Sequence, residues 1–272
     1  MLRRQIRNPW QSRTPKESPL TDNPLRNPGQ SLDEAIQTLL GEDVLGFIIA
    51  ILFCNVMTAY EWWRWYTKMP YSPGVLTLFC VVVTAFSTSR LCALKKQLKT
   101  LRLARDGEKA VGQYLEMLRE TGYRVFHDVP GKNFNLDHVI IGPKGIFTIE
   151  TKTFRKPAIG KANVCFDGTS INVNGYKPDR DPIVQALAQA SWLSELVKNS
   201  TGHTHSVKPV VVFPGWFVRS GLDARSSNVW VINPKGLPKF LDGSPQKLSP
   251  EEIQLIAYHL SRYIRTQPLY MA

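Results

Sequence analysis

The chain has 272 residues, which is room for one mid-sized globular domain with accessory segments. It carries 34 Lys and Arg against 22 Asp and Glu, a formal charge of +12 that favours a polyanionic partner, either nucleic acid or an anionic membrane surface. The four cysteines form no Cys-x-x-Cys pair and have no His at ligand spacing. The sequence therefore indicates neither a disulfide scaffold nor a zinc site.

The amino-terminal segment, residues 1–30, is rich in Arg, Pro, Asn and Ser and lacks periodic apolar positions. This composition predicts an unstructured chain. A short amphipathic helix is expected next, over residues 31–40, with Ser31 as N-cap and Glu34 completing a capping box. We assign residues 1–43 to a basic, largely disordered segment.

Two apolar runs follow, at residues 44–60 and 74–94. The first has no side chain that is charged at neutral pH, and Trp62, Trp63 and Trp65 come directly after it, as in an interfacial aromatic belt. Arg90 lies near the end of the second run, where its side chain can extend to the headgroups. The pattern predicts a transmembrane hairpin over residues 44–94. The alternative is a buried helical hairpin in a soluble protein.

The basic residues outside the two runs predict the orientation of this hairpin. They are Arg3, Arg4, Arg7, Arg13, Lys16 and Arg26 before the first run, and Lys95, Lys96, Lys99, Arg102 and Arg105 after the second. The connection between the runs has only Arg64 and Lys68, so the positive-inside rule places both termini in the cytoplasm. We expect a two-pass protein of the cell (inner) membrane, with a basic juxtamembrane helix at residues 95–105 that contacts anionic headgroups rather than DNA.

The remaining chain, residues 106–272, has the pattern of a cytoplasmic α/β domain. The expected elements are a helix capped by Asp106 and ending near Gly122, strands at 123–129, 136–141 and 145–153, a hairpin of 162–166 and 170–173, a helix from the Asp181 cap to about 199, strands at 207–213 and 228–232, and a helix from the Ser249 capping box to about 265.

Charged side chains interrupt the apolar pattern of two central strands. Strand alternation places Glu150 and Lys152 on one face, and an antiparallel pairing brings Asp137 of the preceding strand beside them. Two acids and an ammonium group on the face of a core sheet are costly unless they bind something. Glu108 lies on the apolar stripe of the helix at Asp106, and Gln185 lies on a stripe of the later helix.

This set of residues resembles the PD-(D/E)xK nuclease superfamily. More closely, it is similar to the nuclease-related domain, NERD, which has a Gly-Glu helix start, an Asp-His-Val strand, a Glu-x-Lys strand and a Gln that follows a Pro on the next helix. The resemblance covers roughly residues 106–232. It implies a restriction-endonuclease-like core (helix, three-strand sheet, helix, strand) and catalytic roles for the matching residues, which are Glu108, Asp137, Glu150, Lys152 and Gln185.

The chemistry of these residues suits phosphodiester hydrolysis. Asp137 and Glu150 are hard oxygen ligands for Mg²⁺ or Mn²⁺, and the main-chain carbonyl of Thr151 is a candidate third ligand. Lys152 would position or deprotonate the attacking water and stabilise phosphate charge. The predicted function is a membrane-anchored, metal-dependent nuclease that acts on nucleic acid, DNA in particular, in DNA processing or defence. The sequence names no protein partner.

Several alternatives stay open. Glu150 and Lys152 also fit an ordinary ion pair on a strand. Glu108 also fits an acid in the first turn of a helix, where it interacts with the helix dipole. Gln185 also fits a buried side chain that is hydrogen-bonded to the backbone. His138 points to the opposite face from Asp137, where a packing role is expected. At the level of function, the alternatives are a catalytically inactive, membrane-tethered domain that binds nucleic acid or protein, and a basic surface that serves only anionic lipid.

Overall fold

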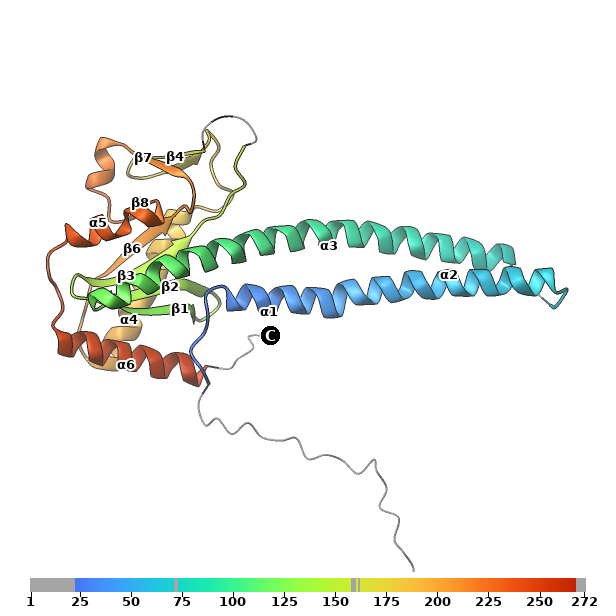
Figure 1. The fold of residues 1–272 in the computed structure, drawn as a ribbon, viewed down its shortest axis with the longest axis horizontal. Coiled ribbons are helices and arrows are strands. Elements are labelled where there is room, and N and C mark those ends of the chain that lie inside the picture. The colour runs from blue at the N-terminus through green and yellow to red at the C-terminus, as the bar shows by residue number, and fades with distance from the viewer. Residues whose placement is uncertain (1–22, 71–72, 158–159, 161, 268–272) are drawn as a thin grey trace, which may run out of the picture.

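The computed structural model describes residues 23–70, 73–157, 160 and 162–267. An α/β domain sits at one end of a long helical hairpin (Figure 1). The helices are α1 Gln30–Thr38, α2 Leu45–Tyr66, α3 Pro73–Glu116, α4 Pro182–Thr201, α5 Leu237–Asp242 and α6 Pro250–Thr266. The strands are β1 Arg124–Pro130, β2 Asn135–Gly142, β3 Gly145–Thr151, β4 Asn163–Phe166, β5 Ile171–Val173, β6 Val207–Val212, β7 Phe217–Ser220 and β8 Trp230–Ile232.

The main sheet has the order β1-β2-β3-β6-β8. Its first three strands are antiparallel neighbours, and β6 and β8 are added in parallel. One face carries Val139 and Ile146, which pack against α4 and α6, and the other carries Ile140 and Ile149, which pack against α3 and α5. The order α3, β1–β3, α4, β6 is the expected helix, three strands, helix, strand. The predicted α/β core and its preceding apolar helices are confirmed.

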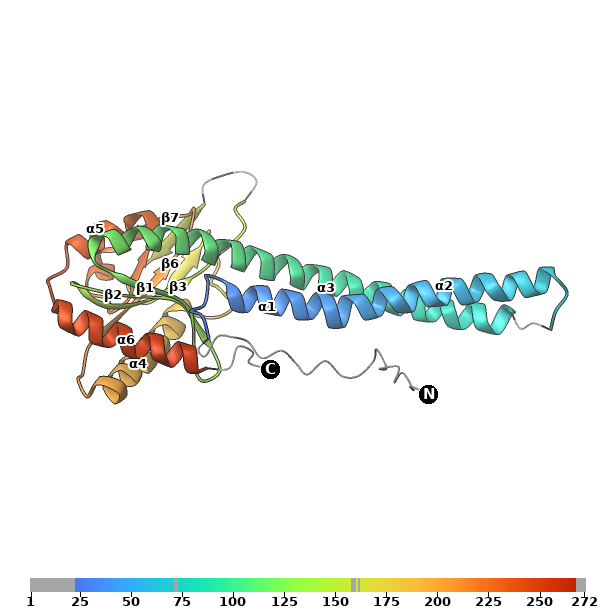
Figure 2. The same ribbon diagram turned by 60° about the horizontal axis from the view of Figure 1, so that its bottom comes forward.

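Helices α2 and α3 are long and apolar enough to cross a membrane. Only 11 % of the apolar window of each is buried inside the protein, so the two helices are not the buried core of a soluble fold. Helix α2 and the first part of α3 pack along each other away from the α/β domain, as both views show (Figures 1 and 2). The end of α3 packs on the main sheet.

The predicted helix start at Asp106 is wrong, because α3 continues without a break from Pro73 to Glu116. The residues between the apolar run and Asp106 are mostly Leu, Lys, Gln and Arg, which are strong helix formers. Asp106 accepts hydrogen bonds from Arg105 instead of capping a helix. Gly107 serves close packing, since a Cβ there would collide with the side chain of Thr153, two residues after β3. The expected boundary between residues 105 and 106 therefore lies inside one helix.

The described part of the amino-terminal segment packs on the domain. The disorder predicted for residues 1–30 is wrong for residues 23–29; residues 1–22 lie outside the described chain. The predicted capping box of α1 is also wrong, because Ser31 donates from N and Oγ to Asp128, and Glu34 accepts from Arg26. The N-cap position is Gly29, in the left-handed region. The local sequence predicted that Ser31 caps the helix, whereas Ser31 donates its hydrogen bonds to the carboxylate of Asp128, which is distant in sequence.

A buried ion pair joins this segment to the sheet. Arg26 Nε lies 2.7 Å from Asp128 Oδ2, and both side chains are almost inaccessible. Asp128 has φ 48°, an unfavourable conformation for a residue with a side chain, and Ser31 and Asn135 also donate to its carboxylate. Removal of the Arg26 charge would leave the Asp128 carboxylate buried without this counter-ion.

Arg26→Ala is therefore expected to destabilise the full chain strongly. Breaking a buried pair from one side costs about 3–5 kcal/mol, which corresponds to a fall of roughly 6–15 °C in the unfolding midpoint. The measurement is thermal unfolding in detergent, followed by tryptophan fluorescence, with exposed Arg225→Ala as the matched control. Equal midpoints for the two variants would contradict a structural role for the Arg26–Asp128 pair.

Candidate active site

Glu150 lies at the end of β3 with 3 % of its surface exposed. Its Oε1 is 2.7 Å from Lys152 Nζ and accepts a hydrogen bond of 2.7 Å from Gln185 Nε2. Its Oε2 accepts from Gln189 Nε2 at 2.6 Å. The buried carboxylate is thus held by one ammonium group and two amides. These contacts reduce the free-energy cost of removing the carboxylate from water.

Lys152 follows β3, and its N–H donates to the Val212 carbonyl of β6 at 2.9 Å. Its Nζ also donates to Gln185 Oε1 at 2.8 Å. Gln185 therefore contacts both members of the Glu150–Lys152 pair, and Asp181 and Pro182 place it by starting α4 as expected. The side chains of Glu150, Lys152 and Gln185 lie together, on the face that strand alternation indicated.

Asp137 lies on β2. In the antiparallel pairing of β2 with β3, His138 lies opposite Ile149, so the same register places Asp137 opposite Glu150. Its Oδ2 accepts from the Thr151 N–H at 2.6 Å. A strand residue directs its N–H and C=O toward the same neighbour, so the Thr151 carbonyl also faces β2. Burial raises the pKa of Asp137 well above its usual range, and the charges of Glu150 and Glu108 raise it further, against the Thr151 hydrogen bond and Lys152.

Glu108 approaches the same carboxylates from α3. It is 8 % exposed, and burial raises its pKa to about 8, with further contributions from Asp128 and Glu150 and opposition from Lys152. Because α3 starts at Pro73, Glu108 is far from a helix N-terminus, and the helix dipole does not explain its position. The alternative of a first-turn acid is excluded.

Gln189 is a contact of Glu150 that the sequence analysis did not assign. It is 2 % exposed and sits one turn after Gln185, so helical periodicity was the signal that pointed to it. Within the described chain its Oε1 is a buried acceptor with no hydrogen-bond partner. A buried amide beside the Glu150 carboxylate with one free acceptor can accept a further donor, such as a water on a bound ion.

The donor set fits a hard divalent cation. All candidate groups are oxygens, and three carboxylates are set against one ammonium group, an imbalance that a cation would offset. No three His, Cys, Asp or Glu side chains of the described residues converge closely enough to hold a metal by themselves. The candidate ligands are therefore two carboxylates, of Asp137 and Glu150, with the Thr151 carbonyl.

Residues 103–214 match the family model of the nuclease-related domain. The chain carries a NERD domain. The match runs from α3 through β6, so it includes all of the residues described above, while β8, α5 and α6 lie beyond it. Searches of curated proteins and of solved structures found no match.

Two histidines of the NERD domain, His127 and His138, contact each other across β1 and β2. His138 is fully buried on the opposite face of the sheet, with its Nδ1 2.8 Å from Nδ1 of His127, whose Nε2 contacts Glu116 at 2.7 Å. Burial lowers the pKa of His138 well below its usual range, and the neighbouring His127 lowers it further. A neutral, packed His138 agrees with the packing role expected from strand alternation.

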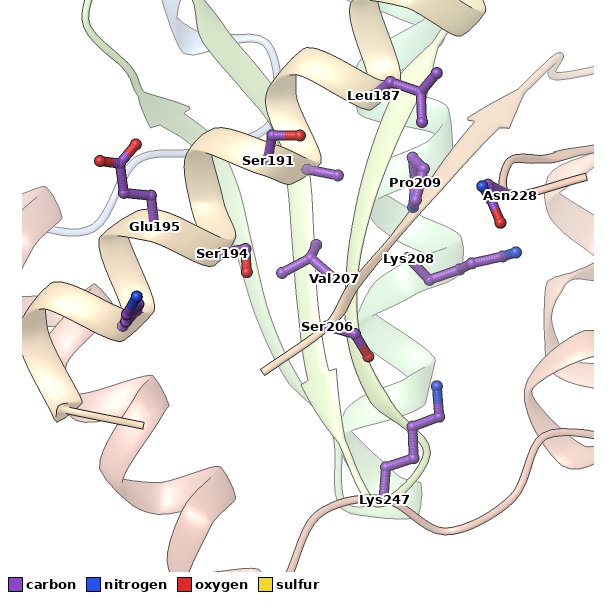
Figure 3. A pocket seen from close by; sticks show the side chains of 12 residues that line it. Leu187, Ser191, Ser194, Glu195, Ser206, Val207, Lys208, Pro209, Asn228 and Lys247 are labelled. Carbon is purple, nitrogen blue, oxygen red and sulfur yellow. The ribbon is translucent and has the colours of Figure 1, made fainter. Parts of the chain in front are cut away.

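A cavity of 780 Å³ lies between α4 and the start of β6, where three lysines and three serines line it (Figure 3). Burial lowers the pKa of Lys208, and the nearby charge of Lys247 lowers it further. None of the candidate site residues lines this cavity. It opens at the beginning of the parallel strands β3 and β6, whereas Glu150 and Lys152 lie at their other end.

The raised pKa of Glu108 predicts a pH-dependent stability. Between about pH 4.5 and 8 the folded state holds a proton that the unfolded state releases, so stability falls as pH rises through this window. Glu108→Gln keeps the neutral form, and in metal-free buffer it is expected to stabilise the chain by on the order of a few kcal/mol near pH 8 and to change little near pH 4.

The measurement is the unfolding midpoint at both pH values, with exposed Glu120→Gln as control. A Glu108→Gln chain that gains no more at the higher pH than at the lower would show that Glu108 is ionised in the folded protein.

Proposed function

We propose that this chain is a membrane-anchored, Mg²⁺- or Mn²⁺-dependent nuclease that hydrolyses phosphodiester bonds of nucleic acid, DNA in particular. The observation that carries the proposal is the group of three carboxylates around one lysine at the end of β3 in a NERD domain. Two of the carboxylates have raised pKa values, which is common at functional sites. A role in DNA processing or defence is part of the proposal.

The metal would be held by the Asp137 and Glu150 carboxylates and the Thr151 carbonyl. When bound, it would supply charge for the phosphate oxygens and lower the pKa of a bound water. Among the described residues, Glu150 Oε2 accepts from Gln189 alone, whereas Oε1 contacts both Gln185 and Lys152. Oε2 is therefore the oxygen that would bind a cation with the loss of fewer hydrogen bonds. Cation binding requires Asp137 ionised, so it would release protons.

Lys152 would act directly on the substrate. Its ammonium group stabilises charge on the scissile phosphate, and its neutral form takes a proton from the attacking water. Gln185 accepts from Lys152 Nζ and so fixes its position, while Gln189 fixes Glu150. Glu108 would hold a proton at neutral pH and lose it when a cation approaches.

The second candidate is a catalytically inactive domain that binds nucleic acid or protein on a nuclease-like scaffold. The observation in its favour is that both Glu150 oxygens are already bonded to side chains of the protein. Metal binding separates the two candidates, because an inactive scaffold with a closed Glu150 network needs no cation.

Anchoring by α2 and α3 in the cell (inner) membrane is proposed from their length, apolar surface and basic flanks. Both termini and the NERD domain would lie in the cytoplasm. The proposed contact with anionic headgroups falls to Lys95, Lys96, Lys99 and Arg102, because Arg105 pairs with Asp33 and Asp106.

Metal titration together with cleavage of plasmid and single-stranded DNA tests the nuclease proposal on the full chain in detergent. Asp137→Ala or Glu150→Ala is expected to abolish both Mn²⁺ binding and cleavage. Lys152→Ala should keep metal binding and lower the cleavage rate by about 10²-fold or more. The double carboxylate variant should be little worse than either single one.

Glu195→Ala, a carboxylate near the far end of α4, is the control and should bind and cleave as the wild type does. A wild-type chain that binds no Mn²⁺ and cleaves neither substrate would replace the nuclease proposal with the inactive scaffold.

Cysteine labelling tests the proposed topology. In intact cells an impermeant thiol reagent should label Lys68→Cys, in the short connection between α2 and α3, and should not reach the exposed Cys165 of the NERD domain until the cells are opened. Labelling of Cys165 but not of residue 68 in intact cells would reverse the orientation.

A further inference from the structure

The small sheet β5-β4-β7 has one packed face and one exposed face. Val164 and Phe166 of β4 are buried in a core with Val173 of β5 and Trp216. The alternate residues point outward, and the pairings Asn163–Phe217 and Cys165–Arg219 place them side by side. The outward face is formed by β4, β5 and β7, and none of these strands supplies a residue named above for the candidate active site.

A cavity of 580 Å³ lies at this face and is lined by Lys156, Asn163, Phe217 and Arg219, among others. Phe217 is 63 % exposed, and the Arg219 guanidinium carbon lies 5.9 Å from the centre of its ring. None of the described residues that line the cavity is acidic. An open aromatic ring flanked by two cations matches a planar, polyanionic ligand.

The same face is fixed in position relative to Lys152. Lys156 is four residues after Lys152, so at most about 14 Å of chain separates their α-carbons. Between them, Phe154 stacks on Phe213 with 6.1 Å between ring centres and accepts a hydrogen bond at its carbonyl from Trp216 Nε1 at 3.3 Å. Phe217 follows the buried Trp216 directly, so these contacts hold it beside the chain that leaves the candidate active site.

We propose that the outward face of β4 and β7 binds single-stranded nucleic acid next to the scissile phosphate. Phe217 stacks on an unpaired base, and Lys156 and Arg219 contact the flanking phosphates. This inference rests on the proposed nuclease function and assigns its substrate class. Stacking on every base type is possible because each has a flat aromatic face, so the surface selects for unpaired bases rather than for sequence.

A duplex does not satisfy the same contacts. Its base faces are covered by neighbouring pairs, so only the two cations would interact, through phosphate charge that carries no preference for strand form. Phe217 therefore separates the two substrates, whereas Lys156 and Arg219 do not. Its substitution is the informative one.

The test is binding of a fluorescent oligothymidylate and of a blunt-ended, fully paired duplex to the full chain in detergent, with EDTA present so that nothing is cleaved. Phe217→Ala is expected to weaken single-strand binding by about tenfold or more and to leave duplex binding unchanged. Phe217→Trp should restore binding, and Tyr258→Ala, an exposed aromatic on α6, should have no effect. Arg219→Gln should reduce the slope of log affinity against log salt by about 0.7.

Unchanged single-strand binding of Phe217→Ala would overturn the inference, as would equal losses for the oligothymidylate and the duplex. Binding to phosphatidylglycerol vesicles that depends on Phe217, with no binding of the oligothymidylate, would assign the face to lipid and also overturn it. Cleavage in Mn²⁺ is scored separately. A wild type that cleaves while Phe217→Ala binds normally removes this inference alone, and Phe217-dependent binding without any cleavage removes the nuclease proposal alone.

Discussion

Three carboxylates share a poorly hydrated site with a single ammonium group, and the surrounding structure is arranged to tolerate this imbalance. Glu150 is held by Lys152 and two glutamine amides, while burial and the neighbouring carboxylates raise the pKa values of Glu108 and Asp137. Each carboxylate comes from a different element, so only the assembled fold brings the charges together. The repulsion is a standing cost of folding that a bound cation would remove. A purely structural role would not require three such groups in one place.

Helix α3 makes this site part of the same rigid element as the second apolar run. From Leu94, at the end of that run, to Glu108 the helix rises about 21 Å without interruption. In the membrane-anchored protein proposed above, a flexible tether would let the NERD domain sample many heights above the membrane, whereas a continuous helix would set one height. Helix α1 packs on α3, and Asp33 pairs with Arg105 and Lys109, which braces the same stretch. Substrate access would thus be determined by the distance between the site and the end of the apolar run.

The sequence predicted the elements whose signals are local. The Asp181–Pro182 start of α4 and the Ser249 capping box of α6 both formed, and strand alternation placed Glu150 and Lys152 together. The errors have a common physical origin in contacts between distant residues. Asp106-Gly107-Glu108 has the composition of a helix start, but its glycine is required by the approach of Thr153 from another element. Ser31 has the composition of a cap, but Asp128 takes its donors. No local pattern contains such partners.

Asp128 connects the candidate site with the amino-terminal segment. The β1–β2 pairing is interrupted at the position where Asp128 would lie opposite Asp137, and there its backbone takes the left-handed conformation with φ 48°. Its charge also contributes to the raised pKa of Glu108, so it acts on the candidate site although it touches none of the proposed metal ligands. Arg26, from the segment that precedes the first apolar run, pairs with Asp128. The amino-terminal segment is therefore an electrostatic component of the NERD domain, because its buried Arg26 offsets a fourth carboxylate, that of Asp128, beside the other three.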